Sequence, residues 1–210
     1  MQRFIKGFVV AALLAGSAAM AAAQPLEPKQ AKRVLFKGDK YVIEQLEGVD
    51  VGPVTGVQVE NFLNAMQNPK VARQMQAMGF TVGYYGAMAV QPGRPLSDKT
   101  MVLSNNLHSP EAASAAALRA CNALEGPECV SVALILPRRY KPRELTLSHA
   151  ATESFRDQWG RPKQPQYLAY SPSTPAFVIA KGVGADAVAI EKCNQATEGA
   201  NDCVIAIAQE

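Results

Sequence analysis

The stretch ACNALEGPECVSVA, Ala120 to Ala133, places two cysteines eight positions apart on either side of a Glu-Gly turn. A second stretch, KCNQATEGANDCVIAIA, repeats this arrangement near the C-terminus. With an offset of 72 residues, a Cys-Asn pair of the first stretch falls on a Cys-Asn pair of the second, and small slips align the Glu-Gly and Cys-Val pairs that follow. Agreement in both spacing and residue type predicts an internal repeat that organises the fold.

Each copy has the pattern of a helix placed between strands. In the first copy, the run Ser-Pro-Glu at residues 109–111 predicts a helix start, because Ser caps a helix, Pro fits its first position and Glu favours its first turn. A predicted buried stripe follows in each copy: Ala117, Leu118, Cys121 and Leu124 in the first, Ala189, Ile190, Cys193 and Ala196 in the second. Short apolar segments rich in β-branched residues come after both helices, and two strand-like segments precede each helix. The sequence therefore predicts an α+β fold in which two β-β-α-β repeats form a mixed or antiparallel sheet with helices packed on it.

The rest of the chain adds an N-terminal α/β extension and a linker. We expect a signal peptide over residues 1–23, a helical and strand segment over 24–80, repeat 1 over 81–140, a linker with a helix over 141–165 and repeat 2 over 166–210. Within the extension, the patterns predict a helix at 28–36, a strand at 40–47, a loop at 48–56 and helical segments at 57–67 and 70–80. The linker helix, over 148–160, carries the only Trp and is expected to cap the seam between the repeats.

The N-terminus, MQRFIKGFVVAALLAGSAAMAAAQ, has the features of a secretory signal peptide. Arg3 and Lys6 precede an apolar run from Phe8 to Leu14, and small residues lead up to Gln24. The apolar run is shorter than the roughly 20 residues that a membrane-spanning helix needs. We therefore expect cleavage before Gln24 and a periplasmic or secreted protein without a membrane span.

Charge argues against a nucleic-acid binder. Removing 23 of the 210 residues leaves 187, and it removes two of the 21 Lys and Arg residues, so that 19 cations face 18 acidic residues. The net charge falls from +3 to +1, whereas nucleic-acid-binding domains usually carry a basic excess. The expected partner is an unknown protein or a cell-envelope component.

The four cysteines allow three pairings. We favour Cys121 with Cys129 and Cys193 with Cys203, because each bridge would join a helix end to the adjoining strand within one copy, and an oxidising compartment permits it. Each bridge would contribute about 2 to 3 kcal/mol by the loop-entropy model. A redox centre would need Cys-x-x-Cys at a helix N-terminus, and a zinc site would need closer cysteine pairs. The spacing predicts structural disulfides, with no metal and no cofactor.

The segment PRRYKPR, residues 137–143, is the densest positive cluster of the sequence. Its cations are a candidate patch for an anionic partner such as a glycan, a lipid phosphate or an acidic protein: Arg138, Arg139, Lys141 and Arg143. The alternative is a solvated linker between prolines.

Two functions of different classes remain open. The favoured one is a non-enzymatic, disulfide-stabilised protein that binds a partner or the cell envelope. The alternative is a small envelope hydrolase or transferase whose catalytic residues meet only in space, because no Gly-x-Ser-x-Gly motif occurs. A deep pocket lined by His108 or His149 together with an acid and a hydroxyl would favour the enzyme. A shallow apolar or basic face would favour binding.

A family resemblance rests on the segments YYGAMAV, SPEAASAAALRACNAL, CVSVALILPRRY, AFVIAKG, AIEKCNQ and DCVIAIA. Together, from about Gly83 to the C-terminus, they resemble a family of small secreted bacterial proteins, of alphaproteobacterial type, with cysteine-containing repeats of unknown function. Some members carry the label 5-aminolevulinate synthase. That enzyme resembles the pyridoxal-phosphate transaminases, which are much longer and hold a Schiff-base lysine in a two-domain site. Here Lys181 or Lys192 would have to serve without that surrounding pattern, so the resemblance implies a secreted repeat protein and not this synthase.

Overall fold

The structure is a computed structural model that describes residues 24–38, 40–77, 83–160 and 163–210. The predicted leader lies outside these residues. The N-terminal part contains α1 (Pro28–Val34), β1 (Tyr41–Gln45), α2 (Pro53–Gln67) and α3 (Pro69–Ala77). The first β-β-α-β run follows as β2 (Gly86–Val90), β3 (Met101–Ser104), α4 (Pro110–Asn122) and β4 (Val130–Pro137). After α5 (His149–Gln158), the second run consists of β5 (Gln166–Tyr170), β6 (Phe177–Lys181), α6 (Ala185–Gln195) and β7 (Val204–Gln209).

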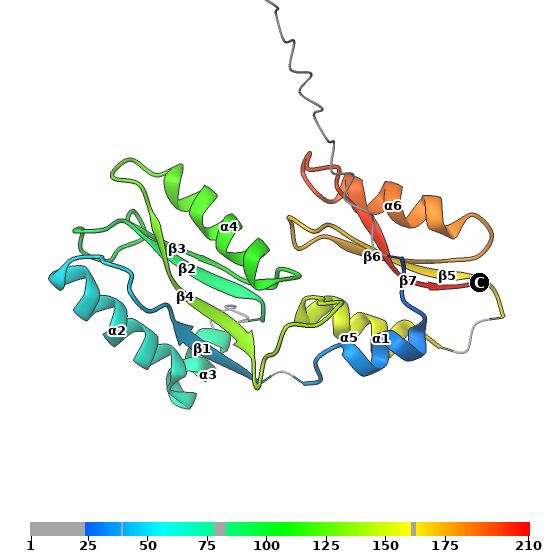
Figure 1. Cartoon of the computed structure of the whole chain (residues 1–210), viewed down its shortest axis with the longest axis horizontal. Coiled ribbons are helices and arrows are strands. Elements are labelled where there is room, and N and C mark those ends of the chain that lie inside the picture. The colour runs from blue at the N-terminus through cyan, green and yellow to red at the C-terminus, as the bar shows by residue number, and fades with distance from the viewer. Residues whose placement is uncertain (1–23, 39, 78–82, 161–162) are drawn as a thin grey trace, which may run out of the picture.

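The strands form two separate antiparallel sheets. One has four strands in the order β1-β4-β2-β3, and the other has three in the order β6-β5-β7. The predicted α+β class is confirmed. The expected single sheet is wrong: the two β-β-α-β runs lie in separate sheets, and β1 adds a fourth strand to the first. Figure 1 shows the two sheets side by side, each between helices.

We call the four-stranded sheet with α2 and α4 the first unit, and the three-stranded sheet with α1, α5 and α6 the second unit. The two units share their strand order, since the first strand of each run lies between the other two. They also share an irregularity: the pairing of the first with the last strand of the run shifts between Met88 and Ala89 in one unit and between Leu168 and Ala169 in the other. Such a shift marks a β-bulge, which bends the bulged strand. An origin by duplication stays a prediction.

Small side chains hold the helices of the two runs close to their sheets. Ala113 and Ala117 of α4 and Ala189 of α6 are fully buried, which allows close packing of helix against strand. The predicted stripe of α6 is wrong at its last position, because Ala196 is the C-cap residue and is exposed. The start of α4 is as predicted: the Ser109 hydroxyl accepts a hydrogen bond from the backbone N–H of Ala112 at 3.0 Å.

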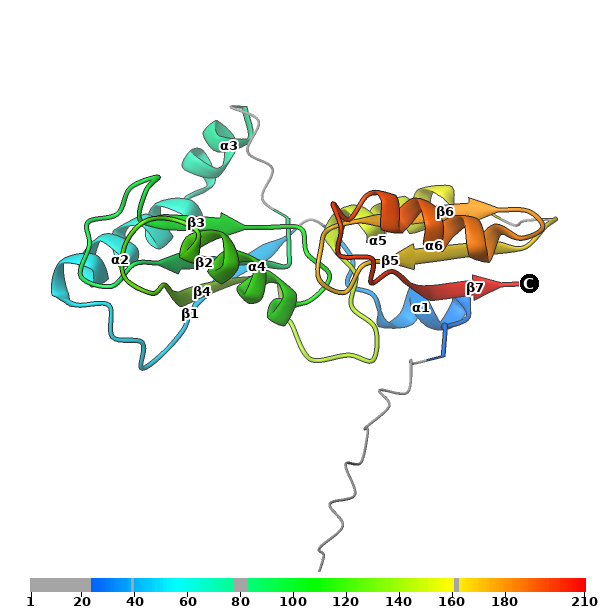
Figure 2. The ribbon, with the colours of Figure 1, turned by 90° about the horizontal axis from the view of Figure 1, so that it is seen from above.

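Helices cover both faces of each sheet. In the first unit α4 and α2 lie on opposite faces, and in the second unit α6 lies opposite α1 and α5 (Figures 1 and 2). Helix α2 begins at Pro53, so the predicted loop over 48–56 is wrong at its end, where Pro occupies the first helical turn. The end of the helical segment predicted at 70–80 falls on residues outside those described.

The N-terminal segment is divided between the two units. Ala31 and Leu35 are buried in the second unit with Phe155 and Ile207, and Leu26 forms a parallel bridge with Ile207. By contrast, β1 pairs with β4 and belongs to the first unit. The linker helix α5 also joins both units, because its first residue, His149, donates its backbone N–H to the Tyr84 carbonyl at 3.1 Å. No helix in the described ranges is long and apolar enough to cross a membrane.

Candidate anion-binding surface

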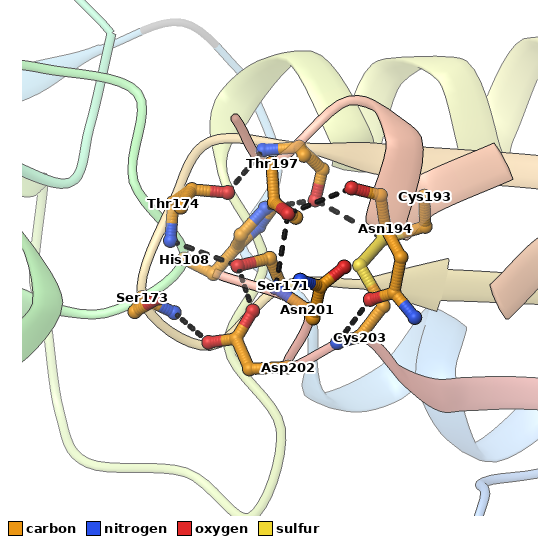
Figure 3. The surroundings of a disulfide bond; sticks show 11 residues. His108, Ser171, Ser173, Thr174, Cys193, Asn194, Thr197, Asn201, Asp202 and Cys203 are labelled. Carbon is orange, nitrogen blue, oxygen red and sulfur yellow. Dashed lines mark hydrogen bonds between the residues drawn. A yellow bond between two sulfur atoms is a disulfide. The ribbon is translucent and has the colours of Figure 1, made fainter. Parts of the chain in front are cut away.

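Both predicted disulfides are present. Cys121 is bonded to Cys129 and Cys193 to Cys203, with a Cα–Cα distance of 6.0 Å in each pair. The Asn that follows the first Cys of each pair closes the same turn: the Asn122 side-chain oxygen accepts from the Cys129 N–H at 2.7 Å. In the second unit, Asn194 accepts from the Cys203 N–H at 3.0 Å (Figure 3). The repeated Cys-Asn pair is therefore a structural device, a role that sequence reasoning did not assign.

The carboxylate of Asp202, next to Cys203, stabilises the turn at the second disulfide. The Ser171 hydroxyl donates to Asp202 Oδ1 at 2.5 Å, and the Ser173 N–H donates to Oδ2 at 3.1 Å (Figure 3). Burial alone would raise the pKa of Asp202, but the hydrogen bonds from Ser171 and Ser173 outweigh burial and hold the pKa below its usual value. Asp202 thus connects the loop after β5 to the segment before β7, and both of its oxygens are in use.

His108 joins three segments of the chain. Its Nδ1 accepts from the Ser148 N–H at 3.1 Å, and its Nε2 lies 3.2 Å from the Ala176 carbonyl oxygen, to which it donates in this tautomer. The side chain is 1% exposed, and burial lowers its pKa to about 4, so the ring is neutral at neutral pH. Both ring nitrogens are bonded to the main chain, which leaves neither free to act as a general base.

The second histidine lies at the start of α5. His149 Nε2 is 3.3 Å from Glu153 Oε1, a distance that fits an ion pair although the direction does not satisfy a hydrogen bond. Its ring meets the Tyr84 ring edge-on, with centroids 5.4 Å apart. Neither histidine lines any of the hollows described below. These hollows therefore do not provide the histidine, acid and hydroxyl that would favour an enzyme.

Two adjacent hollows are lined mainly by cations. One, of about 430 Å³, is lined by Lys32, Lys37 and Arg156. The other, of about 400 Å³, is lined by Lys37, Gly38, Lys40, Pro137, Arg138 and Arg139. We call their six cations the basic seam: Lys32, Lys37, Lys40, Arg138, Arg139 and Arg156. These six cations come from α1, from the segment before β1, from the end of β4 and from α5. No acidic side chain is among the described residues that line the two hollows.

Sheet pairing explains why distant cations meet here. Tyr41 of β1 pairs with Pro137 of β4, and the Arg138 N–H donates to the Lys40 carbonyl at 3.0 Å. Arg139 follows with a φ of 62°, in the left-handed region, where the chain turns away from the strand. The antiparallel pairing therefore brings the start of β1 and the end of β4 to the same edge of the sheet.

Two arginines support the seam through the segment that carries Lys37. The guanidinium of Arg143 lies 3.6 Å from the centroid of the Phe36 ring and donates to the Val34 carbonyl. Arg156 donates to the Phe36 carbonyl at 2.7 Å. Both contacts hold the segment between α1 and β1 in place.

The structure divides the four cations of the predicted patch. Arg138 and Arg139 lie in the basic seam, Arg143 supports it, and Lys141 is exposed and lines neither hollow. Sequence reasoning missed the other members of the seam: Lys32, Lys37, Lys40 and Arg156. A signal existed in the cation-rich run over residues 29–40, but only the pairing of β1 with β4 brings that run to the PRRYKPR segment.

Little in the described part of the chain neutralises these charges. The salt bridge found there joins His149 to Glu153, and none of the six cations forms one with a described residue. A surface with one sign of charge attracts ligands of the opposite sign over about 8 Å at physiological salt. The described residues contain no group of three or more His, Cys, Asp or Glu side chains that could hold a metal ion.

Fold and surface together define a class: a two-unit, disulfide-stapled α+β protein with a basic seam. No family model, curated protein or solved structure matches the chain.

Proposed function

We propose that this protein is a non-enzymatic, disulfide-stabilised periplasmic or secreted protein that binds an anionic component of the cell envelope through the basic seam. One observation carries the proposal: cations from separate segments converge on two adjacent hollows that share Lys37. The two disulfides support the location, since such bonds persist in oxidising compartments. The proposal is in keeping with the resemblance to secreted cysteine-repeat proteins and does not include the synthase activity.

The chemistry of the seam favours phosphate or carboxylate groups. Arginine offers a planar fork of donors that matches either group, and lysine adds a compact point charge. A single exposed ion pair contributes little, about 0.2 to 1 kcal/mol, so a useful affinity requires several contacts at once. The sharing of Lys37 by the two hollows suits a ligand with repeated anionic groups, such as an acidic glycan or a surface of anionic lipids.

Binding to vesicles tests the proposal. The protein should bind vesicles of phosphatidylglycerol and phosphatidylcholine at low salt, but not vesicles of phosphatidylcholine alone, and added salt should release it. An acidic polysaccharide serves as the second probe and separates a lipid from a glycan ligand. Replacing Arg138 and Arg139 with Gln should weaken binding about tenfold, since two contacts of about 0.7 kcal/mol are lost.

The matched control also removes two exposed cations but lies outside the seam: Lys99→Gln with Lys192→Gln. It should change binding less than about twofold if the seam carries the affinity. Equal losses in the two double variants, or no binding to either anionic probe at low salt, would refute the proposal.

A further inference from the structure

A pocket separate from the basic seam opens on the second unit. It has a volume of about 270 Å³, and its lining comes from the N-terminal segment, the linker, β5 and β7. Ala206 and Leu145 are its buried residues, and Leu26 and Tyr170 are half-buried. Val204 is 39% exposed. The pocket therefore has mostly apolar walls and an open mouth.

The first unit shows what this part of a sheet normally contacts. In β2 and β4, Val90 pairs with Val130, and in β5 and β7 Tyr170 pairs with Val204, so the two pairs are equivalent in the sheets. Val90 is fully buried in the first unit, where Val59 of α2 belongs to the same apolar cluster.

In the second unit the corresponding face is covered only in part. Helices α1 and α5 bury Leu168, Ala206 and Ile207, whereas Val204, at the end of this face, stays exposed and lines the pocket. The end of the sheet face that aliphatic side chains of α2 cover in the first unit is therefore open in the second unit. An aliphatic group is the chemistry that fits these walls.

The polar residues of the pocket lining indicate which headgroup an aliphatic ligand would carry. Glu144 and Gln24 both line the pocket and are both exposed, which places them at its mouth. In the described part of the chain Glu144 forms no salt bridge. Cleavage before Gln24 would leave an α-amino group at the same mouth, and this group is neutral well above pH 8. At such a pH the carboxylate favours a cationic headgroup over a neutral one and disfavours an anionic one. The charge preference is therefore the opposite of that of the basic seam.

We propose that this pocket binds a small amphiphile with an aliphatic chain of about eight carbons and an ammonium headgroup, the chain against Val204 and Ala206 and the headgroup at Glu144. The chain length of the ligand is chosen from the volume of the pocket, about 270 Å³. An apolar cavity of about 150 Å³ takes benzene, and pockets for drug-sized ligands begin near 300 Å³, so the ligand should be larger than benzene and smaller than a drug. This site is independent of the proposed anion binding.

Titrations followed by NMR at pH 9, where an α-amino group at Gln24 is neutral and the probe ammonium is still charged, test the proposal on the protein as cells accumulate it. The probes are octylammonium, octanol and octanoate. Octylammonium should saturate the pocket with a Kd below about 1 mM and bind about threefold more tightly than octanol, with octanoate the weakest. Shortening the ammonium chain should weaken binding by roughly fourfold per methylene.

Three variants locate the site. Val204→Trp should block the pocket and weaken octylammonium binding more than about tenfold, whereas Val183→Trp, the same change at a fully exposed position before α6, should leave it unchanged. Glu144→Gln should abolish the preference for octylammonium over octanol while octanol binding persists. The proposal is overturned if no octyl compound gives a saturable shift, if octanoate binds as well as octylammonium, or if Val204→Trp binds like the natural protein.

Discussion

At the scale of single residues, this protein uses polar side chains mainly to hold segments together. Asn122 and Asn194 close the disulfide turns, Asp202 fastens the second corner, and Arg143 positions the segment beside the seam. A hydrogen bond contributes about 1 kcal/mol when it is made, and a buried partner left without it costs more. These side chains therefore matter more for the unique arrangement of the loops than their individual energies suggest.

His108 predicts a specific loss of stability in acid. Its folded pKa, about 4, lies below the usual 6.5, so the neutral ring stabilises the fold fully above pH 6.5 and this contribution is lost as the pH falls through 4. A shift of this size corresponds to roughly 3 kcal/mol in the free energy of unfolding. Urea unfolding between pH 7 and 3.5 measures it.

The variant His108→Phe provides the comparison. It lacks the titrating group, so its free energy of unfolding should change much less between pH 6.5 and 4, whatever its stability at neutral pH. Asp202 acts in the same direction at lower pH, because its folded pKa is depressed below 3.8. Parallel pH curves for the two proteins would contradict the role given to His108.

At the scale of elements, close approach of backbones limits which residues a strand can contain. Gly86 begins β2, the strand that lies between β3 and β4. A Cβ atom at this position would lie 2.6 Å from the Ser104 carbonyl oxygen and 2.9 Å from Ile135 Cδ1. The absence of a side chain is thus what lets the three strands pair here.

The variant Gly86→Ala should lower the free energy of unfolding by about 2 kcal/mol, because a backbone oxygen cannot yield as a flexible side chain can. Thermal and urea unfolding measure the change. Gly160→Ala is the control, since no atom lies within 4 Å of the added Cβ there, and its effect should stay within about 0.5 kcal/mol. If the two variants are equally stable, β2 has room that the structure does not show.

At the scale of the whole molecule, the N-terminal segment ties the units together. Residues 26–35 pack on the second sheet, Phe36 and the next strand join the first unit, and the basic seam lies along this crossing. His108 adds a second link, from the loop before α4 to the loop before β6. The proposed anion-binding surface therefore depends on how the units are joined.

The variant Leu35→Ala tests the division of the N-terminal segment. Leu35 is buried in the second unit, so the truncation should cost about 2 to 4 kcal/mol and increase amide hydrogen exchange first in β5, β6 and β7. Val59→Ala in α2 is the counterpart and should expose β2 and β4 first. The same exchange pattern in both variants would show that the sheets do not open separately.

Local patterns were sufficient for much of this fold. The sequence by itself determined the elements of both runs, the capped start of α4 and the cysteine pairing, because each depends on residues close together in the chain. Only the tertiary structure decided that the runs form two sheets, that α1 packs on the second one, and that Lys32, Lys37, Lys40 and Arg156 join Arg138 and Arg139. The physical reason is that these arrangements depend on strand pairing and burial between segments far apart in the chain, which local periodicity and spacing do not encode.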